Sequence, residues 1–267
     1  MYGNYFRAAC KDAKTARTKK WVSRTVTEER IVTAALLVIG DEILSGRTKD
    51  QNIGFIAEHL TNIGIRLKEV RVVPDIEDDI ADAVNALRRR YTYVFTTGGI
   101  GPTHDDITAD SIGKAFSARV GVDPRAQKIL RDYYAEKGLE LTGARLRMAR
   151  IPEGAELVDN PVSAAPGFRL ENVIVMAGIP SIMQAMLAAV TPSLATGSKL
   201  LSLAISIDRA ESEIAAAFSA HQKLYPDVTM GSYPFMRDGR YAVELVLRCA
   251  DQARLDEAAA TLKRALG

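Results

Sequence analysis

The residues best suited to chemistry lie at positions 96–108, which read Thr-Thr-Gly-Gly-Ile-Gly-Pro-Thr-His-Asp-Asp-Ile-Thr. The glycines of this segment can adopt backbone angles that other residues avoid, so their N–H groups can converge on an anion such as a phosphate. Asp105 and Asp106 lie in the same segment, and two carboxylates about 4 Å apart repel each other by roughly 4 kcal/mol at an effective dielectric of 20. Acidic side chains beside a phosphate-binding loop therefore indicate a bridging divalent cation, and magnesium is the ion we expect.

This segment follows an apolar run that is typical of a buried strand, and strands alternate with helices around it. In chain order, the spacing of apolar residues predicts a strand at 31–39, a polar loop at 41–52, a helix at 53–63, a strand at 65–73, a helix at 76–90, a strand at 91–97 and a helix capped by Thr108. Such alternation is typical of a parallel sheet with right-handed crossovers, in which ligands bind outside the carboxyl ends of the strands.

Three aspartates, Asp41, Asp75 and Asp106, each follow one of the predicted strands. Because the carboxyl ends of parallel strands meet at one edge of a sheet, we expect these carboxylates to converge there. They are the metal ligands that we expect, directly or through water, and Glu42 is expected to orient an attacking water molecule. The amides of the glycine segment and the start of the next helix would hold a diphosphate.

Structural explanations stay open for several of these residues. The glycine segment by itself suits a tight turn between a strand and a helix, although a turn does not account for two adjacent acids. Asp75 suits a helix cap, and Asp41 with Glu42 suits an ordinary turn. Asp50 and Asn52 stand at a helix entrance, where capping and contact with a ribose or a pterin are equally good explanations.

The rest of the chain completes this first domain and adds a second, smaller one. We expect helix at 123–150, short strands at 155–177, a helix at 181–190 and a linker at 192–198. From residue 200 the pattern restarts as strand, helix, strand, strand and helix. The expected organisation is a basic N-terminal arm at 1–30, an α/β domain at 31–191 and an α+β domain at 198–267.

The composition is that of a globular protein with a charged N-terminal arm. Of the 267 residues, 47% are hydrophobic and 25% charged, enough for one large and one smaller core. Residues 1–30 hold eight Lys/Arg against three acidic side chains, so this arm is +5 and the remainder is −3. The arm is expected to be disordered, and the acidic remainder argues against a nucleic-acid surface on the folded body.

Cysteines and histidines narrow the kinds of site to consider. Cys10 and Cys249 are the only cysteines, which argues against a disulfide framework and for a reducing compartment, so we expect a cytoplasmic protein. His59, His104 and His221 are too scattered for a zinc site, and we expect His59 and His221 to be solvated. No apolar stretch is long enough to span a bilayer, so no membrane partner is expected.

Several short motifs follow one another along the chain. They are Gly40-Asp41-Glu42-Ile43-Leu44-Ser45-Gly46, Asp50-Gln51-Asn52, Pro74-Asp75, the segment 96–108, Ala165-Pro166-Gly167-Phe168, Gly178-Ile179-Pro180, Glu211-Ser212-Glu213-Ile214-Ala215 and Gly231-Ser232-Tyr233-Pro234. In this order they resemble the MoaB/Mog molybdopterin-binding domain family, and most closely its CinA-like (competence/damage-inducible protein A) branch. The resemblance implies a three-layer αβα domain with a mostly parallel sheet and a small C-terminal KH-like α+β domain.

The resemblance also implies an activity, a magnesium-dependent pyrophosphatase that acts on ADP-ribose-type nucleotides. The catalytic residues it implies are Asp106 and Asp75, and we expect Glu42 to act with them. The phosphate- and nucleotide-binding residues it implies are Thr97, Gly98, Gly99, Gly101, Pro102, Thr103, Asp50, Asn52, Gly178 and Pro180. The expected partner is a small nucleotide or pterin ligand, and a homo-oligomer is expected because relatives commonly self-associate.

Two other functions stay open. One is a molybdopterin adenylyltransferase-like enzyme of molybdenum cofactor biosynthesis, which would use the same loop with ATP. The other is a noncatalytic module that binds a nucleotide or a pterin.

The chain departs from the family pattern at residues 177–183, which lack a proline and a carboxylate, and at Ser163, which replaces a glycine. Both departures bear on the distal ligand pocket and thus on the substrate. Amidase activity, which belongs to a domain appended in longer relatives, is not expected, nor is RNA binding, because the second unit lacks a Gly-x-x-Gly loop.

Overall fold

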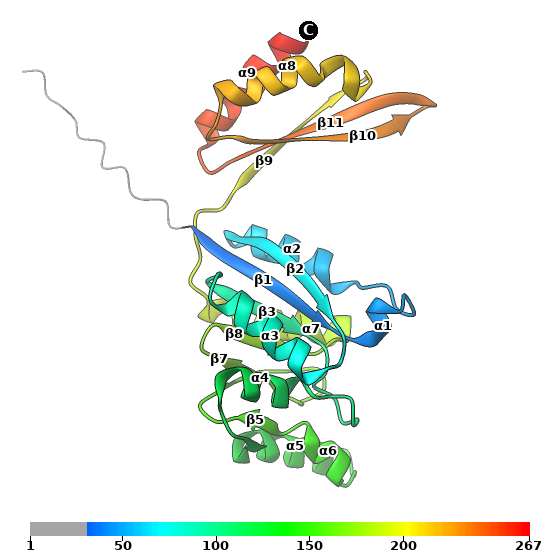
Figure 1. Ribbon diagram of the computed structural model, residues 1–267, viewed down its shortest axis with the longest axis vertical. Helices are drawn as coiled ribbons and strands as arrows, with labels where there is room; N and C mark the ends of the chain where they lie inside the picture. Colours follow the sequence, from blue (N-terminus) through cyan, green and yellow to red (C-terminus); the bar gives the residue numbers. More distant parts are fainter. Residues whose placement is uncertain (1–30) are drawn as a thin grey trace, which may run out of the picture.

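The computed structural model describes residues 31–267, which form two units joined by an extended segment (Figure 1). The predictions for the basic arm at 1–30 and for Cys10 lie outside the described residues. The first unit ends with the 3-10 helix Thr191–Ser193, and the second begins with strand β9, Leu201–Ile207. The connecting segment is anchored to the first unit, because the amide of Gly197 donates a 3.3 Å hydrogen bond to the carbonyl of Gly64.

The first unit is built on a six-stranded sheet in the order β2-β1-β3-β8-β7-β6. Its strands are β1 (Val32–Ile39), β2 (Ile65–Val73), β3 (Tyr93–Thr97), β6 (Glu156–Val158), β7 (Gly167–Leu170) and β8 (Val173–Met176). The first four strands of that order pair in parallel, and the last two pair antiparallel. The mostly parallel sheet predicted from the alternation of strands and helices is therefore confirmed.

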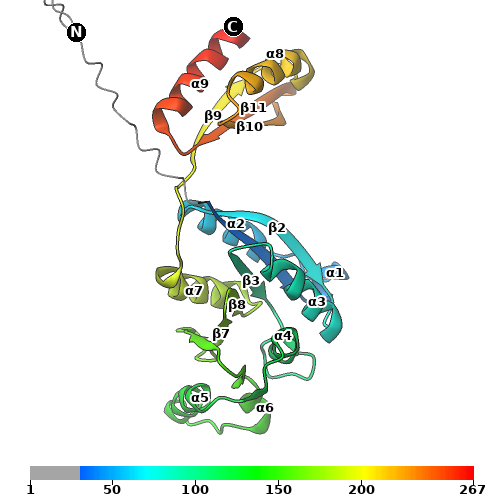
Figure 2. The ribbon, with the colours of Figure 1, turned by 60° about the vertical axis from the view of Figure 1, so that its left-hand side comes forward.

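Helices cover both faces of this sheet, as Figures 1 and 2 show. The helices of this unit are α1 (Asp41–Leu44), α2 (Asn52–Asn62), α3 (Glu77–Arg88), α4 (Thr108–Phe116), α5 (Pro124–Glu136), α6 (Gly143–Arg147) and α7 (Pro180–Val190). Alternate residues of β1 point to opposite faces: Leu37 packs with helices α3 and α4, whereas Leu36 packs with α2 and α7. Both leucines are fully buried, because a strand between two helical layers has no solvated face. The three-layer αβα architecture is thereby confirmed.

Two local features differ from the sequence-based expectation. The predicted polar loop at 41–52 contains the one-turn helix α1, which is too short to produce a helical repeat of apolar residues. The predicted helical region at 123–150 is interrupted at Gly138, which has a φ of 64°. This region is also flanked by a two-stranded antiparallel ladder of β4 (Val120–Val122) and β5 (Arg150–Pro152) that the apolar pattern did not reveal.

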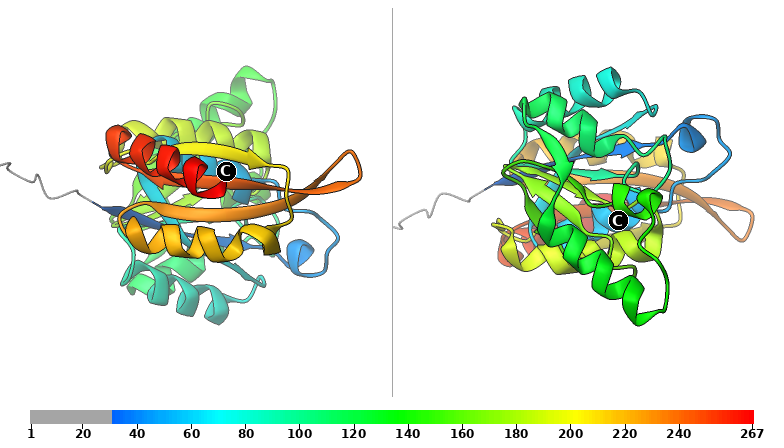
Figure 3. Two further views of the ribbon diagram at one scale, coloured as in Figure 1. Left: turned by 90° about the horizontal axis from the view of Figure 1, so that it is seen from above. Right: turned by 90° about the horizontal axis from the view of Figure 1, so that it is seen from below.

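The second unit is a small α+β fold, as predicted. Its antiparallel sheet has the order β10-β11-β9, and Figure 3 shows both of its helices lying on the same face of that sheet. Besides β9, its elements are α8 (Glu211–Leu224), β10 (Thr229–Arg237), β11 (Arg240–Cys249) and α9 (Gln252–Leu266). Cys249 is buried as a free thiol. Among residues 31–267 no helix is both long enough and apolar enough to cross a bilayer.

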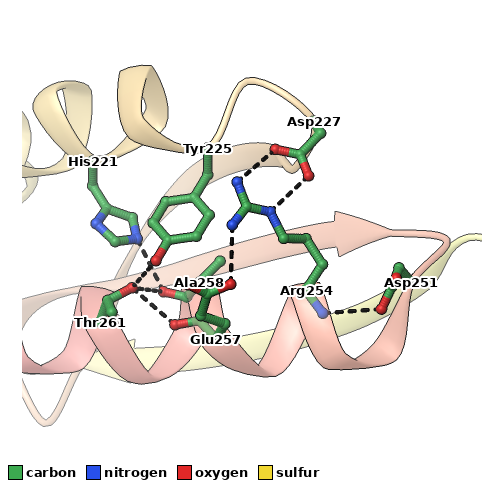
Figure 4. Close-up of polar contacts among 8 residues, drawn as sticks. All are labelled: His221, Tyr225, Asp227, Asp251, Arg254, Glu257, Ala258 and Thr261. Atoms are coloured by element: carbon green, nitrogen blue, oxygen red, sulfur yellow. Dashed lines mark hydrogen bonds and ion pairs between the residues drawn. The ribbon is translucent and has the colours of Figure 1, made fainter. Parts of the chain in front are cut away.

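A polar network ties α9 to the end of α8 and the turn that follows it (Figure 4). Arg254 binds both carboxylate oxygens of Asp227, at 2.7 and 3.0 Å, and its guanidinium carbon lies 4.3 Å from the centre of the Tyr225 ring. His221 is only 4% exposed, and its Nε2 donates to the carbonyl of Ala258 at 2.9 Å. The prediction that His221 is solvated is therefore wrong. The same holds for His59, a half-buried side chain whose Nε2 lies 2.7 Å from the Thr191 hydroxyl.

Candidate functional site

The glycine loop, residues 98–107, turns sharply between β3 and α4. Gly98 and Gly99 have φ values of 105° and 65°, a region that favours glycine. A β-carbon on Gly98 would lie 2.1 Å from the carbonyl oxygen of Ile39, so only glycine fits against the neighbouring strand. Thr108 was predicted to cap α4, but Ile107 takes the capping position and the Thr108 hydroxyl donates instead to the carbonyl of Gly98 at 2.9 Å. The Thr108 side chain thus holds the glycine loop in place and does not cap the N-terminus of α4.

The loop presents N–H groups that the protein itself does not use. The amide of Gly98 donates to the carbonyl of Met176 at 3.2 Å. Within the described chain, the amides of Gly99, Ile100 and Gly101 have no hydrogen-bond acceptor, although all three residues line a cavity. Backbone N–H groups of this kind, close to the N-terminus of a helix, bind anions such as phosphate.

This cavity has a volume of about 570 Å³ and lies at the carboxyl ends of the parallel strands. Its size is within the range of pockets that bind nucleotides and other small molecules, about 300–1,000 Å³. Four of the lining residues are acidic: Glu42, Asp75, Asp105 and Asp106. Of the predicted site residues, the cavity also brings together Gly98, Gly99, Gly101, Pro102, Gly178 and Pro180. The predicted meeting of separate loops at one edge of the sheet is therefore observed for these residues.

The carboxylates of the cavity are held in different ways. Asp75 accepts a 3.0 Å hydrogen bond from the amide of Asp41. Burial is the largest cause that raises the pKa of Asp75, and the charges of Asp41, Glu42 and Asp105 raise it further against the opposing effect of that hydrogen bond. Asp106 accepts from the amide of Thr103 at 2.7 Å and also from its hydroxyl.

The predicted metal triad of Asp41, Asp75 and Asp106 is not formed. The side chain of Asp41 is exposed and does not line the cavity, because Asp41 begins helix α1 and turns its backbone amide, rather than its carboxylate, towards Asp75. Residues 31–267 contain no group of three Asp, Glu, His or Cys side chains that could hold a metal ion. Magnesium, however, is commonly bound by one or two carboxylates together with waters and substrate phosphates. Asp75 and Asp106 beside unpaired amides fit a magnesium ion that arrives with a phosphorylated ligand.

Two predicted ligand residues play supporting roles instead. Asp50 accepts from the amides of Asn52 and Ile53, at 3.0 and 2.7 Å, and so caps α2. Asn52 is 5% exposed, and its Nδ2 donates to the carbonyl of Gly178 at 2.8 Å. Neither residue lines the cavity. The structure thus favours the capping explanation for Asp50, and it makes Asn52 the residue that fastens the cavity wall at Gly178.

Two threonines predicted to bind phosphate are also placed differently. Thr97 is 1% exposed, and its hydroxyl is buried without a hydrogen-bond partner. Because it ends a strand covered on both faces, its side chain does not line the cavity and is not available to a solute. Thr103 lies outside the cavity lining as well, and it acts on the site by holding Asp106.

Replacing Asn52 by alanine should lower the free energy of unfolding by about 1–3 kcal/mol, because it leaves the Gly178 carbonyl without its donor. Denaturant titration measures the change. The matched control is Asn62→Ala, at the exposed opposite end of the same helix. Equal stabilities of the two variants would show that the bond to Gly178 does not anchor the wall.

Sequence reasoning missed a part of the cavity wall that comes from the segment before β7. Asn160 is 4% exposed and organises this segment, accepting from the amides of Val162 and Ser163 and donating to the carbonyl of Ala165. Ser163 and Ile182 both line the cavity. These two positions belong to the departures from the family pattern, and that departure was the one signal in the sequence that could have indicated them.

Comparisons with known proteins identify both units. Residues 35–196 match the model of a family described as a probable molybdopterin binding domain, and residues 199–267 match the middle domain of FAD synthase. A protein of Aeropyrum pernix is 33% identical over 87% of this chain and 90% of its own length. In three other relatives, from Pyrobaculum calidifontis, Metallosphaera sedula and Pyrobaculum aerophilum, the match covers 59 to 61% of their length.

Two further relatives carry names. A CinA-like protein of Desulfosudis oleivorans is 35% identical over 58% of this chain and 38% of its own length. The crystal structure of the protein CinA, of unknown function, from Thermoplasma acidophilum matches with a TM-score of 0.57 at 33% identity, over 61% of this chain and 98% of its own. These matches confirm the resemblance seen in the motifs of the first unit.

Proposed function

We propose, since the chain belongs to the family of probable molybdopterin binding domains, that its cavity binds a nucleotide diphosphate of the ADP-ribose type with magnesium and hydrolyses the diphosphate. The observation that supports this proposal is the combination of unpaired loop amides and four carboxylates in the wall of one cavity. Amides alone would suit any anion. Carboxylates in the same wall would repel a bare phosphate, so a cation has to accompany it.

Different residues of the cavity have different roles in this proposal. The amides of residues 99–101 hold a phosphate oxygen, and Asp75 and Asp106 are placed to bind the cation. Magnesium, when bound, supplies positive charge that offsets the charge of the diphosphate. Glu42 orients the attacking water and accepts its proton, while the bond between phosphorus and the bridging oxygen breaks. With ADP-ribose the products are AMP and ribose 5-phosphate.

Incubation of the purified protein with magnesium and ADP-ribose, or with magnesium, ATP and molybdopterin, tests the proposal. We expect AMP and ribose 5-phosphate from the first mixture, and no product once a chelator has removed the magnesium. Adenylylated pterin from the second mixture would instead identify a molybdopterin adenylyltransferase-like enzyme. Absence of product from both mixtures would leave a noncatalytic binding module.

The raised pKa of Asp75 predicts that the contribution of this residue to the stability of the metal-free protein decreases as the pH rises. A carboxyl group whose pKa in the folded state exceeds its ordinary value of 3.8 binds its proton more tightly in the folded than in the unfolded chain. The contribution of Asp75 to the free energy of unfolding therefore decreases from pH 3.8 up to the raised pKa. Above that pKa the full cost of holding a charged, partly buried carboxylate is present.

The variant Asp75→Asn isolates this effect, because an amide has no charge to bury. We expect the variant to match the native protein near pH 3.8 and to become progressively more stable than it towards neutral pH. Denaturant titrations of both proteins at a series of pH values, in the presence of a chelator, provide the measurement. A stability difference that stays constant with pH would contradict the assigned burial of Asp75.

A further inference from the structure

A small depression adjoins the cavity and shares part of its wall. The shared residues are Gly99, Ile100, Gly101, Asp106 and Met148. The depression has a volume of about 20 Å³, which is space for one group the size of a water molecule or a phosphate oxygen. A ligand atom in this depression would therefore lie directly beside a ligand in the cavity.

Two arginines supply positive charge in this depression. Arg147 is the last residue of α6, and Arg150 is the first residue of β5. Arg150 forms an ion pair with Asp110, so most of its charge is offset. The ionisable residues that line the main cavity itself are all acidic. Of these two arginines, Arg147 is therefore the one whose charge is left for an anionic group bound next to the glycine loop.

Arg147 has no partner among residues 31–267. Its Nε is buried without a hydrogen-bond acceptor, and its guanidinium takes part in no hydrogen bond, ion pair or ring contact there. Arg145, on the same helix, contrasts with it: its guanidinium carbon lies 4.4 Å from the centre of the Tyr134 ring and it binds the carbonyl of Glu140. A buried N–H without an acceptor costs free energy. An acceptor supplied by a ligand would remove that cost.

We infer that Arg147 binds the second phosphate of the diphosphate, while the glycine loop and the acidic wall hold the first with its cation. The inference rests on the proposed function, which places a phosphate at that loop. A guanidinium presents planar, paired donors that match phosphate oxygens. Arg147 would then determine specificity, because it favours ligands with two adjacent phosphates over monophosphates.

Calorimetric titration with inorganic diphosphate and with inorganic phosphate, both with magnesium in excess, tests this inference without a turnover assay. The native protein is expected to bind diphosphate about ten-fold or more tightly than phosphate. Arg147→Gln should remove most of this preference by weakening diphosphate binding while changing phosphate binding little. The control Arg145→Gln, which alters an arginine outside the depression, should retain the preference of the native protein.

Three results would overturn the inference. They are the same preference for diphosphate in Arg147→Gln as in the native protein, equal losses of affinity for both anions, and no preference for diphosphate in the native protein. Hydrolysis of ADP-ribose by a protein that gives one of these results would leave the proposed function standing without the arginine subsite. A preference that depends on Arg147, in a protein without hydrolytic activity, would leave the subsite standing and remove the enzymatic function.

Discussion

Replacing Asp106 by alanine should lower the rate of ADP-ribose hydrolysis by about 10²–10³-fold, which is typical of the loss of one preorganised electrostatic group. Asp106 lines both the cavity and the adjoining depression. Among residues 31–267 it is the only acidic residue that lines both. The fold should persist, because Asp106 is only partly buried and belongs to neither hydrophobic cluster of the first unit. Steady-state rates at saturating magnesium, with circular dichroism as the check on folding, provide the measurement.

Thr103→Val separates the charge of Asp106 from its hydrogen bonding. This variant removes the hydroxyl that donates to Asp106 but keeps the carboxylate and the 2.7 Å bond from the Thr103 amide. We expect it to retain most of the native rate. A loss as large as that of Asp106→Ala would mean that the carboxylate acts by shaping the loop, and undiminished hydrolysis by Asp106→Ala would refute its catalytic role.

Replacing Gly98 by alanine should lower the free energy of unfolding by about 2–5 kcal/mol, the combined cost of a strained backbone and an overpacked contact. The φ of Gly98 is 105°, and an added β-carbon would lie 2.1 Å from the Ile39 carbonyl oxygen. Strand β1 cannot retreat easily, because it is paired on both sides. Denaturant unfolding measures the stability, and the affinity for magnesium with diphosphate should fall in the same variant.

Gly46→Ala is the matched control for this prediction. Gly46 also has a positive φ, 73°, but a β-carbon there would meet no atom within 4 Å. Only the conformational cost remains, about 1–2 kcal/mol. Equal losses in the two variants would show that the close approach of the glycine loop to β1 is not what requires glycine at position 98.

The sheet and the position of the site could be predicted because both depend on patterns that are local in sequence. Buried parallel strands appear as short apolar runs, so the ends of β1 and β3, and the glycine loop just after β3, could be located in the sequence. Parallel pairing then fixed the edge at which Asp75 and the glycine loop meet. The glycines and neighbouring acids indicated the kind of ligand before any contact was known.

What the sequence did not reveal is the direction in which individual atoms point. Asp41 and Thr108 were placed correctly along the chain, but Asp41 contributes its amide to Asp75, 34 positions away, and Thr108 contributes its hydroxyl to the carbonyl of Gly98, 10 positions away. Asn52 donates a hydrogen bond to the carbonyl of Gly178, which lies 126 positions further along the chain. Arg147 becomes notable only because no acidic side chain of residues 31–267 forms an ion pair with it, and a single sequence contains no signal for a missing partner.

A crystal structure with magnesium and a methylene-bridged, non-hydrolysable analogue of ADP-ribose would test the central claim most directly. The account predicts one phosphate at the amides of residues 99–101, with magnesium between its oxygens and the carboxylate of Asp75 or Asp106. A diphosphate bound away from the glycine loop, or held there with no metal contact to either carboxylate, would contradict it.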